Sequence, residues 1–179
     1  MAKDQVKEYI KHQLLHGIRD DGMNIEEMAR TMKKDVELKD GDYCIHICAY
    51  NNNLWAMDKL VLRGFDYNRK NKHGWTALHI ACMRNFKLSI DYLLSLPNID
   101  VNTQTNNLST PMHLLIERGN IINIARLYHH KEFKKGIKNS KGETELEMML
   151  RFGVFDELKD YKEEDKNICP AIINKFCKK

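Results

Sequence analysis

Apolar residues recur at helical spacing in two kinds of short segment along the chain. The first kind follows a turn, as in GDYCIHICA from Gly41, GWTALHIAC from Gly74, LSTPMHLLI from Leu108 and GETELEMML from Gly142. The second kind comes next, at residues 55–68, 89–102 and, more loosely, 124–139. The first segments start 33, 34 and 34 residues apart. This constant period predicts a stack of about four similar units, each with two helices.

Turn and capping residues recur at fixed places in the units. A glycine, which tolerates a positive φ, opens the units at Gly41, Gly74 and Gly142, whereas the third unit has Leu108 there. A threonine suited to the helix N-cap follows at Thr76, Thr110 and Thr144. Pro111 stands at a first helical position, where the missing donor costs nothing. The sequence therefore predicts a turn that leads directly into a helix.

Packing positions also repeat from unit to unit. Small residues that allow close helix approach recur on the first helices: Cys48, Ala49, Ala81 and Cys82. The second helices are expected to place larger apolar residues toward the core: Leu60, Val61, Ile90, Leu93 and Leu94. Gly64 is expected to end one second helix in a left-handed conformation, and Pro97 to end the next. These positions predict a continuous core between stacked helix pairs.

The period and the Thr-x-x-His core, as in TALH and TPMH, resemble the ankyrin repeat. Tyr43-Cys44 replaces the usual Thr-Pro in the first unit, and Glu147 replaces the histidine in the last. The resemblance implies an all-α solenoid of about four helix–turn–helix units with β-turn fingers and a helical cap at each end. The expected repeats are residues 38–70, 71–104, 105–138 and 139–158.

The two ends are predicted to cap this array. Residues 1–37 contain one expected helix over residues 4–18 and another over 25–34, which form a cap or a degenerate repeat. Residues 159–179 form the expected C-terminal capping segment, in which Ile172, Ile173 and Phe176 follow Pro170 on a short helix. Terminal units of a solenoid need such covers because no neighbour buries their outer faces.

Composition favours a water-soluble chain in a reducing compartment. Lys plus Arg is 29 and Asp plus Glu is 25, a net charge of +4 that does not indicate a dedicated nucleic-acid binder. The N-terminus lacks a signal-peptide pattern, and no apolar run is long enough to span a membrane. The odd count of 5 cysteines predicts free thiols. We therefore expect a cytoplasmic monomer, with the nucleus as a second location.

The histidines invite a catalytic or metal-binding interpretation, which the repeat disfavours. His46, His79 and His113 recur once per unit, so each is expected to tie one repeat to the next. Cys44, His46 and Cys48 form C-x-H-x-C, but a helix directs His46 away from the face that the two cysteines share. No phosphate loop, nucleophile elbow or zinc-protease motif occurs. The sequence predicts no enzyme activity, no metal and no cofactor.

The resemblance implies that another protein binds to the fingers and the inner helices, on the concave face of the stack. The contact residues carried over are Lys39, Asp42, Tyr50, Asn51, Lys72, His73, Trp75, Met83, Arg84, Asn107, Ser109, Glu117 and Arg118. Asn106, Glu143, Arg151 and Phe152 occupy further positions of this kind. An exposed Trp75 with Tyr50, Met83 and Arg84 would form a hot-spot cluster. The alternative is that Trp75 packs against the neighbouring finger.

The predicted function is occupation of a partner protein, as an inhibitor, adaptor or competitor. One specific form resembles the inhibitor-of-NF-kappa-B proteins and suppresses host signalling. The alternative is association with nucleic acid, or transcriptional regulation, through the lysines of the loop at residues 131–141. This loop is otherwise explained as a solvated surface, because few aromatic residues lie among its lysines.

Overall fold

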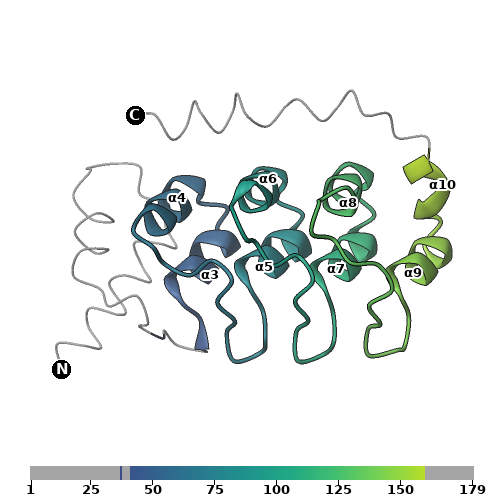
Figure 1. The fold of residues 1–179 in the computed structure, drawn as a ribbon, viewed down its shortest axis with the longest axis horizontal. Coiled ribbons are helices and arrows are strands. Elements are labelled where there is room, and N and C mark those ends of the chain that lie inside the picture. Colours follow the sequence, from purple (N-terminus) through teal and green to yellow (C-terminus); the bar gives the residue numbers. More distant parts are fainter. Residues whose placement is uncertain (1–36, 38–40, 160–179) are drawn as a thin grey trace.

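Four stacked pairs of helices make up the part of the chain that the computed structural model describes, residue 37 and residues 41–159. The first helices of the pairs are α3 (Cys44–Tyr50), α5 (Ala77–Arg84), α7 (Pro111–Arg118) and α9 (Glu145–Arg151). The second helices are α4 (Leu54–Leu62), α6 (Lys87–Ser95), α8 (Ile121–Tyr128) and α10 (Val154–Lys159). The first helices form one row, and the second helices form another (Figure 1). These residues contain no strand, so the predicted all-α solenoid of four units is confirmed.

Long loops connect each pair to the next and project to one side of the stack (Figure 1). We call residues 69–75, 103–109 and 137–143 the second, third and fourth fingers, after the unit that each precedes. Each finger closes with a pair of backbone hydrogen bonds, such as Asn71 N to Trp75 O and Gly74 N to Asn71 O, both 2.9 Å. The third finger closes in the same way between Thr105 and Ser109. The fingers therefore share one turn, including the finger that lacks a glycine.

Threonine side chains start three of the four first helices, as predicted. Thr76, Thr110 and Thr144 have extended backbones, and the side chain of each accepts a hydrogen bond from the amide three residues later. Pro111 occupies the first turn of α7. These bonds satisfy amide groups that a helix N-terminus otherwise leaves without a partner. The local sequence therefore decides where each of these helices begins.

Two of the three repeated histidines, His46 and His79, connect consecutive units through ring hydrogen bonds, whereas Nε2 of the buried His113 has no hydrogen-bond partner in the described structure. His79 accepts a hydrogen bond from the Thr76 amide at Nδ1, so its Nε2 carries the proton that it donates to the Ser109 carbonyl at 3.2 Å. His46 Nε2 lies 2.9 Å from the Trp75 carbonyl oxygen in the same way. Burial lowers the pKa of both rings, that of His79 to about 4. Both rings are therefore neutral, structural groups, as the repeat pattern predicted.

The core lies between the two rows of helices and between successive pairs. The four small residues of the first helices, Cys48, Ala49, Ala81 and Cys82, are completely buried. Leu60, Ile90 and Leu93 of the second helices are buried as expected, while Val61 and Leu94 are half-buried and pack against the same core. Small side chains on the first helices let α3, α5 and α7 pack closely along the row.

Polar groups also join the second helices of neighbouring units. Arg126 on α8 forms a salt bridge to Asp91 on α6, with 3.1 Å between Nε and Oδ1, and both side chains are largely buried. Tyr92 on α6 donates to Asp58 on α4 at 3.1 Å. A buried charge is strongly destabilising without a partner. These contacts therefore help to fix the register of one unit against the next.

The fourth unit ends with α10, a helix that the sequence pattern does not predict. Val154 is buried at its start, and α10 contacts both α8 and α9. The predicted helices at residues 4–18 and 25–34, and the predicted cap after Pro170, lie outside the described residues. In the described part of the chain, no helix is long and apolar enough to cross a membrane.

Candidate protein-binding surface

The predicted contact positions fall into two groups by exposure. Seven are exposed to solvent: Tyr50, Lys72, His73, Arg84, Asn107, Glu117 and Arg118. Five are half-buried: Asp42, Asn51, Trp75, Met83 and Ser109. Lys39 lies outside the described residues. Among the further positions, Asn106, Arg151 and Phe152 are exposed and Glu143 is half-buried. The first group forms the candidate surface, because its side chains are available to a partner.

Tyr50 and Arg84 form an exposed pair that joins the first two units. The Arg84 guanidinium carbon lies 4.3 Å from the centre of the Tyr50 ring, and it lies 5.6 Å from the ring of Phe86. Tyr50 retains 45% of its surface exposure. Tyrosine and arginine are among the residues most enriched at binding hot spots. Stacking holds the arginine in place, so a partner would lose little entropy in ordering it.

The sequence expectation of an exposed Trp75 is wrong. Trp75 is half-buried and packs against the hydrophobic core, with its ring centre 6.1 Å from that of His79. Met83 is half-buried against the same core. Trp75 precedes the N-cap of α5, Thr76, and its ring lies beside that of His79 in the first turn of this helix. Trp75 therefore packs against the core, while the alternative of a contact with the neighbouring finger, like its role in partner binding, stays a prediction.

Several predicted finger residues also support neighbouring fingers. The Asp42 carboxylate accepts a hydrogen bond from Asn71 Nδ2 at 2.7 Å. The Asn106 amide donates to the His73 carbonyl at 3.0 Å, and Asn106 Nδ2 donates to the Lys72 carbonyl at 2.9 Å. The carbonyl groups of residues 72 and 73 are therefore occupied within the protein, while the side chains of Lys72 and His73 remain exposed.

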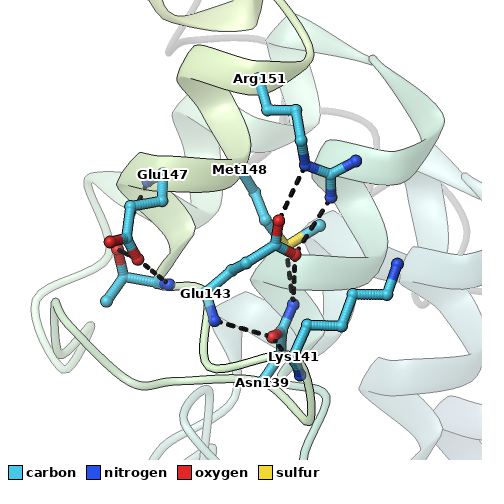
Figure 2. A network of polar contacts seen from close by, with 7 residues as sticks. Asn139, Lys141, Glu143, Glu147, Met148 and Arg151 are labelled. Carbon is cyan, nitrogen blue, oxygen red and sulfur yellow. Dashed lines mark hydrogen bonds and ion pairs between the residues drawn. The ribbon is translucent and has the colours of Figure 1, made fainter.

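The fourth unit carries a polar network around its finger, which Figure 2 shows. Arg151 binds the Glu143 carboxylate through both oxygens, at 2.9 and 3.1 Å. Asn139 Oδ1 accepts from the amides of Lys141 and Glu143 at 2.9 and 3.0 Å. Hydrogen bonds from Asn139 and Arg151 lower the pKa of Glu143. Because these two side chains neutralise each other, this end of the surface offers Phe152, 45% exposed, rather than a free charge.

Glu147 takes the place of the repeated histidine in this network. Its carboxylate accepts hydrogen bonds from the amide and the hydroxyl of Thr144 at 2.7 and 2.9 Å (Figure 2). These bonds lower the pKa of Glu147. A glutamate three residues after a threonine N-cap forms a capping box. The substitution therefore keeps the helix start that the threonine and histidine provide in the second and third units.

The lysines of the predicted basic loop are all exposed: Lys131, Lys134, Lys135, Lys138 and Lys141. The Lys135 ammonium lies 4.7 Å from the centre of the Tyr128 ring. Glu145, an acidic residue close to this loop, is buried and accepts a hydrogen bond from the Gly136 amide at 2.9 Å. The loop therefore adds a positively charged area beside the third and fourth fingers.

Three cysteines lie in the buried core of the described residues. Burial raises the pKa of Cys44 to about 11, and it also raises the pKa of Cys48 and Cys82. These three buried thiols are not joined in disulfides and remain protonated at neutral pH. No group of three metal-binding side chains occurs within residues 41–159. Cys169 and Cys177 lie outside the described residues.

Sequence reasoning did not single out five exposed apolar residues: Leu62, Leu108, Ile122, Leu146 and Leu150. Leu108 at the tip of the third finger is 48% exposed, and Leu150 on α9 is 60% exposed. The signal for Leu108 was present, because it stands where the other units have glycine. The residue corresponding to Leu150 is Cys82 in the second unit, which the third unit buries, so only the position of Leu150 in the last described first helix exposes it.

Comparisons with known proteins agree with this architecture. A family model described as ankyrin repeats in three copies matches residues 27–147, more than half of the chain. The chain is 31% identical over 124 residues to the SMC5-SMC6 complex localization factor protein 1 of Bos taurus, and 30% identical over 121 residues to that of Homo sapiens. Each alignment covers 66% of the chain and 11% of the relative.

A spider toxin is also similar. Alpha-latrotoxin-Lg1a of Latrodectus geometricus is 34% identical over 116 residues, 63% of the chain and 8% of the toxin. The chain thus spans about a tenth of the length of these relatives, which differ in their named roles. What they share with it is the repeat array. The stacked helix pairs, the linking histidines and the family match together show that this chain belongs to the ankyrin-repeat family.

Proposed function

We propose that this protein acts without catalysis, by occupying a partner protein on the surface made by its fingers and first helices. Ankyrin repeats are protein-interaction modules. One observation supports the proposal that the partner contacts the fingers and first helices. Tyr50 and Arg84 stack on each other at 4.3 Å from different units, and both remain exposed. Neither side chain contributes to the buried core. This pair is therefore the proposed centre of the contact.

The role of such a contact is that of an inhibitor, adaptor or competitor. Two of the relatives are named as localization factors, and an adaptor that holds a partner in place fits that description. The relatives reported above do not include an inhibitor of NF-kappa-B, so that narrower version rests on fold analogy. Co-precipitation with the transcription factor, together with a reporter assay, tests it. A lack of association rejects that version without affecting the broader proposal.

Affinity capture followed by mass spectrometry tests the broader proposal. Wild type is compared with Arg84→Ala and Tyr50→Ala, and Arg63→Ala, at the end of the second helix α4, is the matched control. We expect a partner captured by wild type and by the control to be lost from both test variants. Binding that all four proteins retain equally contradicts the proposed surface. Circular dichroism of each variant shows whether the fold is intact.

The second candidate function is association with nucleic acid through residues 131–141. The observation in its favour is the exposure of all five lysines in this loop. Binding to phosphates releases counterions, so the affinity would fall steeply with salt concentration. Titration of labelled duplex DNA at several salt concentrations tests it, with Lys134→Glu as the variant. A weak signal that does not depend on salt removes this candidate.

A further inference from the structure

The second and third fingers touch through their backbones, and Gly74 makes this possible. A Cβ added at Gly74 would lie 2.7 Å from the Asn106 amide nitrogen, well inside a normal contact. The Asn106 amide hydrogen-bonds to the His73 carbonyl across this contact. The same closeness recurs one unit earlier, where a Cβ at Gly41 would lie 2.7 Å from Lys72 Cβ. A glycine at this position therefore allows one finger to pack on the next.

The third and fourth fingers meet differently, because Leu108 occupies the glycine position. Gln104 Nε2 bridges the two fingers by donating to the Leu108 carbonyl and to the Lys138 carbonyl, both at 2.8 Å. Ser140 corresponds to Asn106, but its amide makes no backbone hydrogen bond to the third finger in the described structure. A similar side-chain bridge joins the second and third fingers, where Lys70 Nζ donates to the Gln104 carbonyl at 3.3 Å, so the difference between the two contacts is the missing backbone hydrogen bond. We call Gln104, Leu108, Lys138, Ser140 and Lys141 the seam.

Leu108 is unfavourable for folding at this place. Its φ is +57°, in the left-handed region that a residue with a Cβ rarely adopts. Nearly half of its surface stays exposed, at 48%, so burial does not compensate fully. A residue whose strained backbone is not offset by burial of its side chain is a candidate for a functional role.

The charge around the seam indicates what would bind there. Lys138 and Lys141 are exposed on the fourth finger, and Lys134 is exposed in the loop that leads to it. Two carboxylates lie near them: Glu143, which Arg151 binds and which also interacts with Lys141, and Glu147, which interacts with Lys138, so the lysines are only partly neutralised. An apolar side chain surrounded by lysines complements a segment that combines acidic residues with an apolar one.

We propose that the seam binds an acidic segment of the partner protein, and that an apolar side chain of this segment packs on Leu108. The inference rests on the proposed function, because it assumes a protein partner. It adds the chemistry of that partner and a second contact site, away from the Tyr50–Arg84 pair. The carboxylates of the segment would face Lys138 and Lys141.

The substitution Leu108→Gly separates binding from stability. Glycine removes the apolar contact and the strain together, so the melting temperature should rise by about 2–4 °C. The affinity for the segment should fall by about tenfold or more, because a leucine contact is lost. A merely structural leucine would not give this combination. Leu62→Ser, at another exposed leucine on α4, is the matched control and should leave the affinity unchanged.

The probe is a library of random peptides displayed on phage and selected on the full chain. We expect the enriched peptides to carry an apolar residue beside Asp or Glu. Fluorescence anisotropy of a selected peptide should show weaker binding to Leu108→Gly and to Lys138→Glu/Lys141→Glu. Enriched peptides without acidic residues, or equal affinity for Leu108→Gly and wild type, overturn the inference.

Two further measurements separate this inference from the other proposals. If the captured partner is lost from Arg84→Ala but retained by Leu108→Gly, the proposed function stands and the seam is rejected. If labelled DNA competes with the peptide and binds Leu108→Gly as well as wild type, the lysines serve nucleic acid and the inference fails. Loss of the captured partner from both variants supports the inference together with the proposed function.

Discussion

Replacing Gly74 with alanine is expected to destabilise the stack much more than the same substitution at Gly142. Both glycines have the same backbone conformation, with φ of +75° and +77°. They differ in surroundings, because a Cβ at Gly74 would meet Asn106 of the third finger at 2.7 Å, whereas a Cβ at Gly142 would meet nothing within 4 Å. The pair therefore separates backbone strain from contact between fingers.

The magnitude follows from two contributions. Placing an alanine in the left-handed region costs about 1–2 kcal/mol, and both variants bear this cost. Only Gly74→Ala also pushes the third finger away, which threatens two hydrogen bonds from Asn106, at 3.0 and 2.9 Å. Each such bond contributes about 0.5–1.5 kcal/mol. We expect Gly142→Ala to lose about 1–2 kcal/mol of unfolding free energy and Gly74→Ala about 2–5 kcal/mol.

Urea denaturation followed by circular dichroism at 222 nm measures both values. Asn106→Ala provides a cross-check, because it removes the side-chain hydrogen bond to Lys72 while leaving the glycine in place. Its effect should be smaller than the difference between the two glycine variants, since the backbone hydrogen bond remains. Equal destabilisation of Gly74→Ala and Gly142→Ala would refute the reasoning, because contact between fingers would then contribute nothing.

Three further predictions concern the interior of the array. Burial lowers the pKa of His79 from 6.5 to about 4, so the unfolded chain takes up its proton first. Stability is therefore present above pH 6.5 and declines by up to about 3 kcal/mol as the pH falls toward 4. Urea titrations across this range check it, and a loss that begins only below pH 4 points to carboxylates instead. Thr110→Ala removes a helix cap and should cost about 1 kcal/mol in the same assay, with no change contradicting the capping role. Arg126→Ala removes the buried salt bridge to Asp91 and should lower the unfolding free energy measurably in the same assay, whereas Arg126→Lys, which keeps the positive charge, should lose less, and equal losses would contradict the role of the salt bridge.

Local chemistry explains why so much of the fold was predictable. A threonine followed three residues later by histidine or glutamate satisfies amides within one turn, wherever the segment lies. The period of 33 and 34 residues then places equivalent apolar residues in register. The helix starts, the buried small residues and the linking histidines all follow from this repetition.

The candidate surface was less predictable, because exposure depends on neighbours from other units. Trp75 stands beside a polar turn in the sequence, which predicted an exposed side chain, but it packs against the core. Helix α10 forms after the last segment in which the repeat can be recognised. The stacking of Arg84 on Tyr50 joins residues 34 positions apart, which no local pattern reveals. The list of contact positions carried over from the family therefore included side chains that the array half-buries, such as Trp75 and Met83.

The sequence by itself determined the unit: its turn, its helix starts and the face of each helix that is apolar. These depend on interactions within about one turn of helix, which residue order fixes directly. Only the tertiary structure decided which side chains stay exposed and which fingers touch. Leu108 shows the difference. The sequence shows that a leucine stands where other units have glycine, but whether this side chain is buried or exposed depends on how closely the fourth finger approaches the third. That distance is set by packing between units, and packing involves residues that the sequence separates.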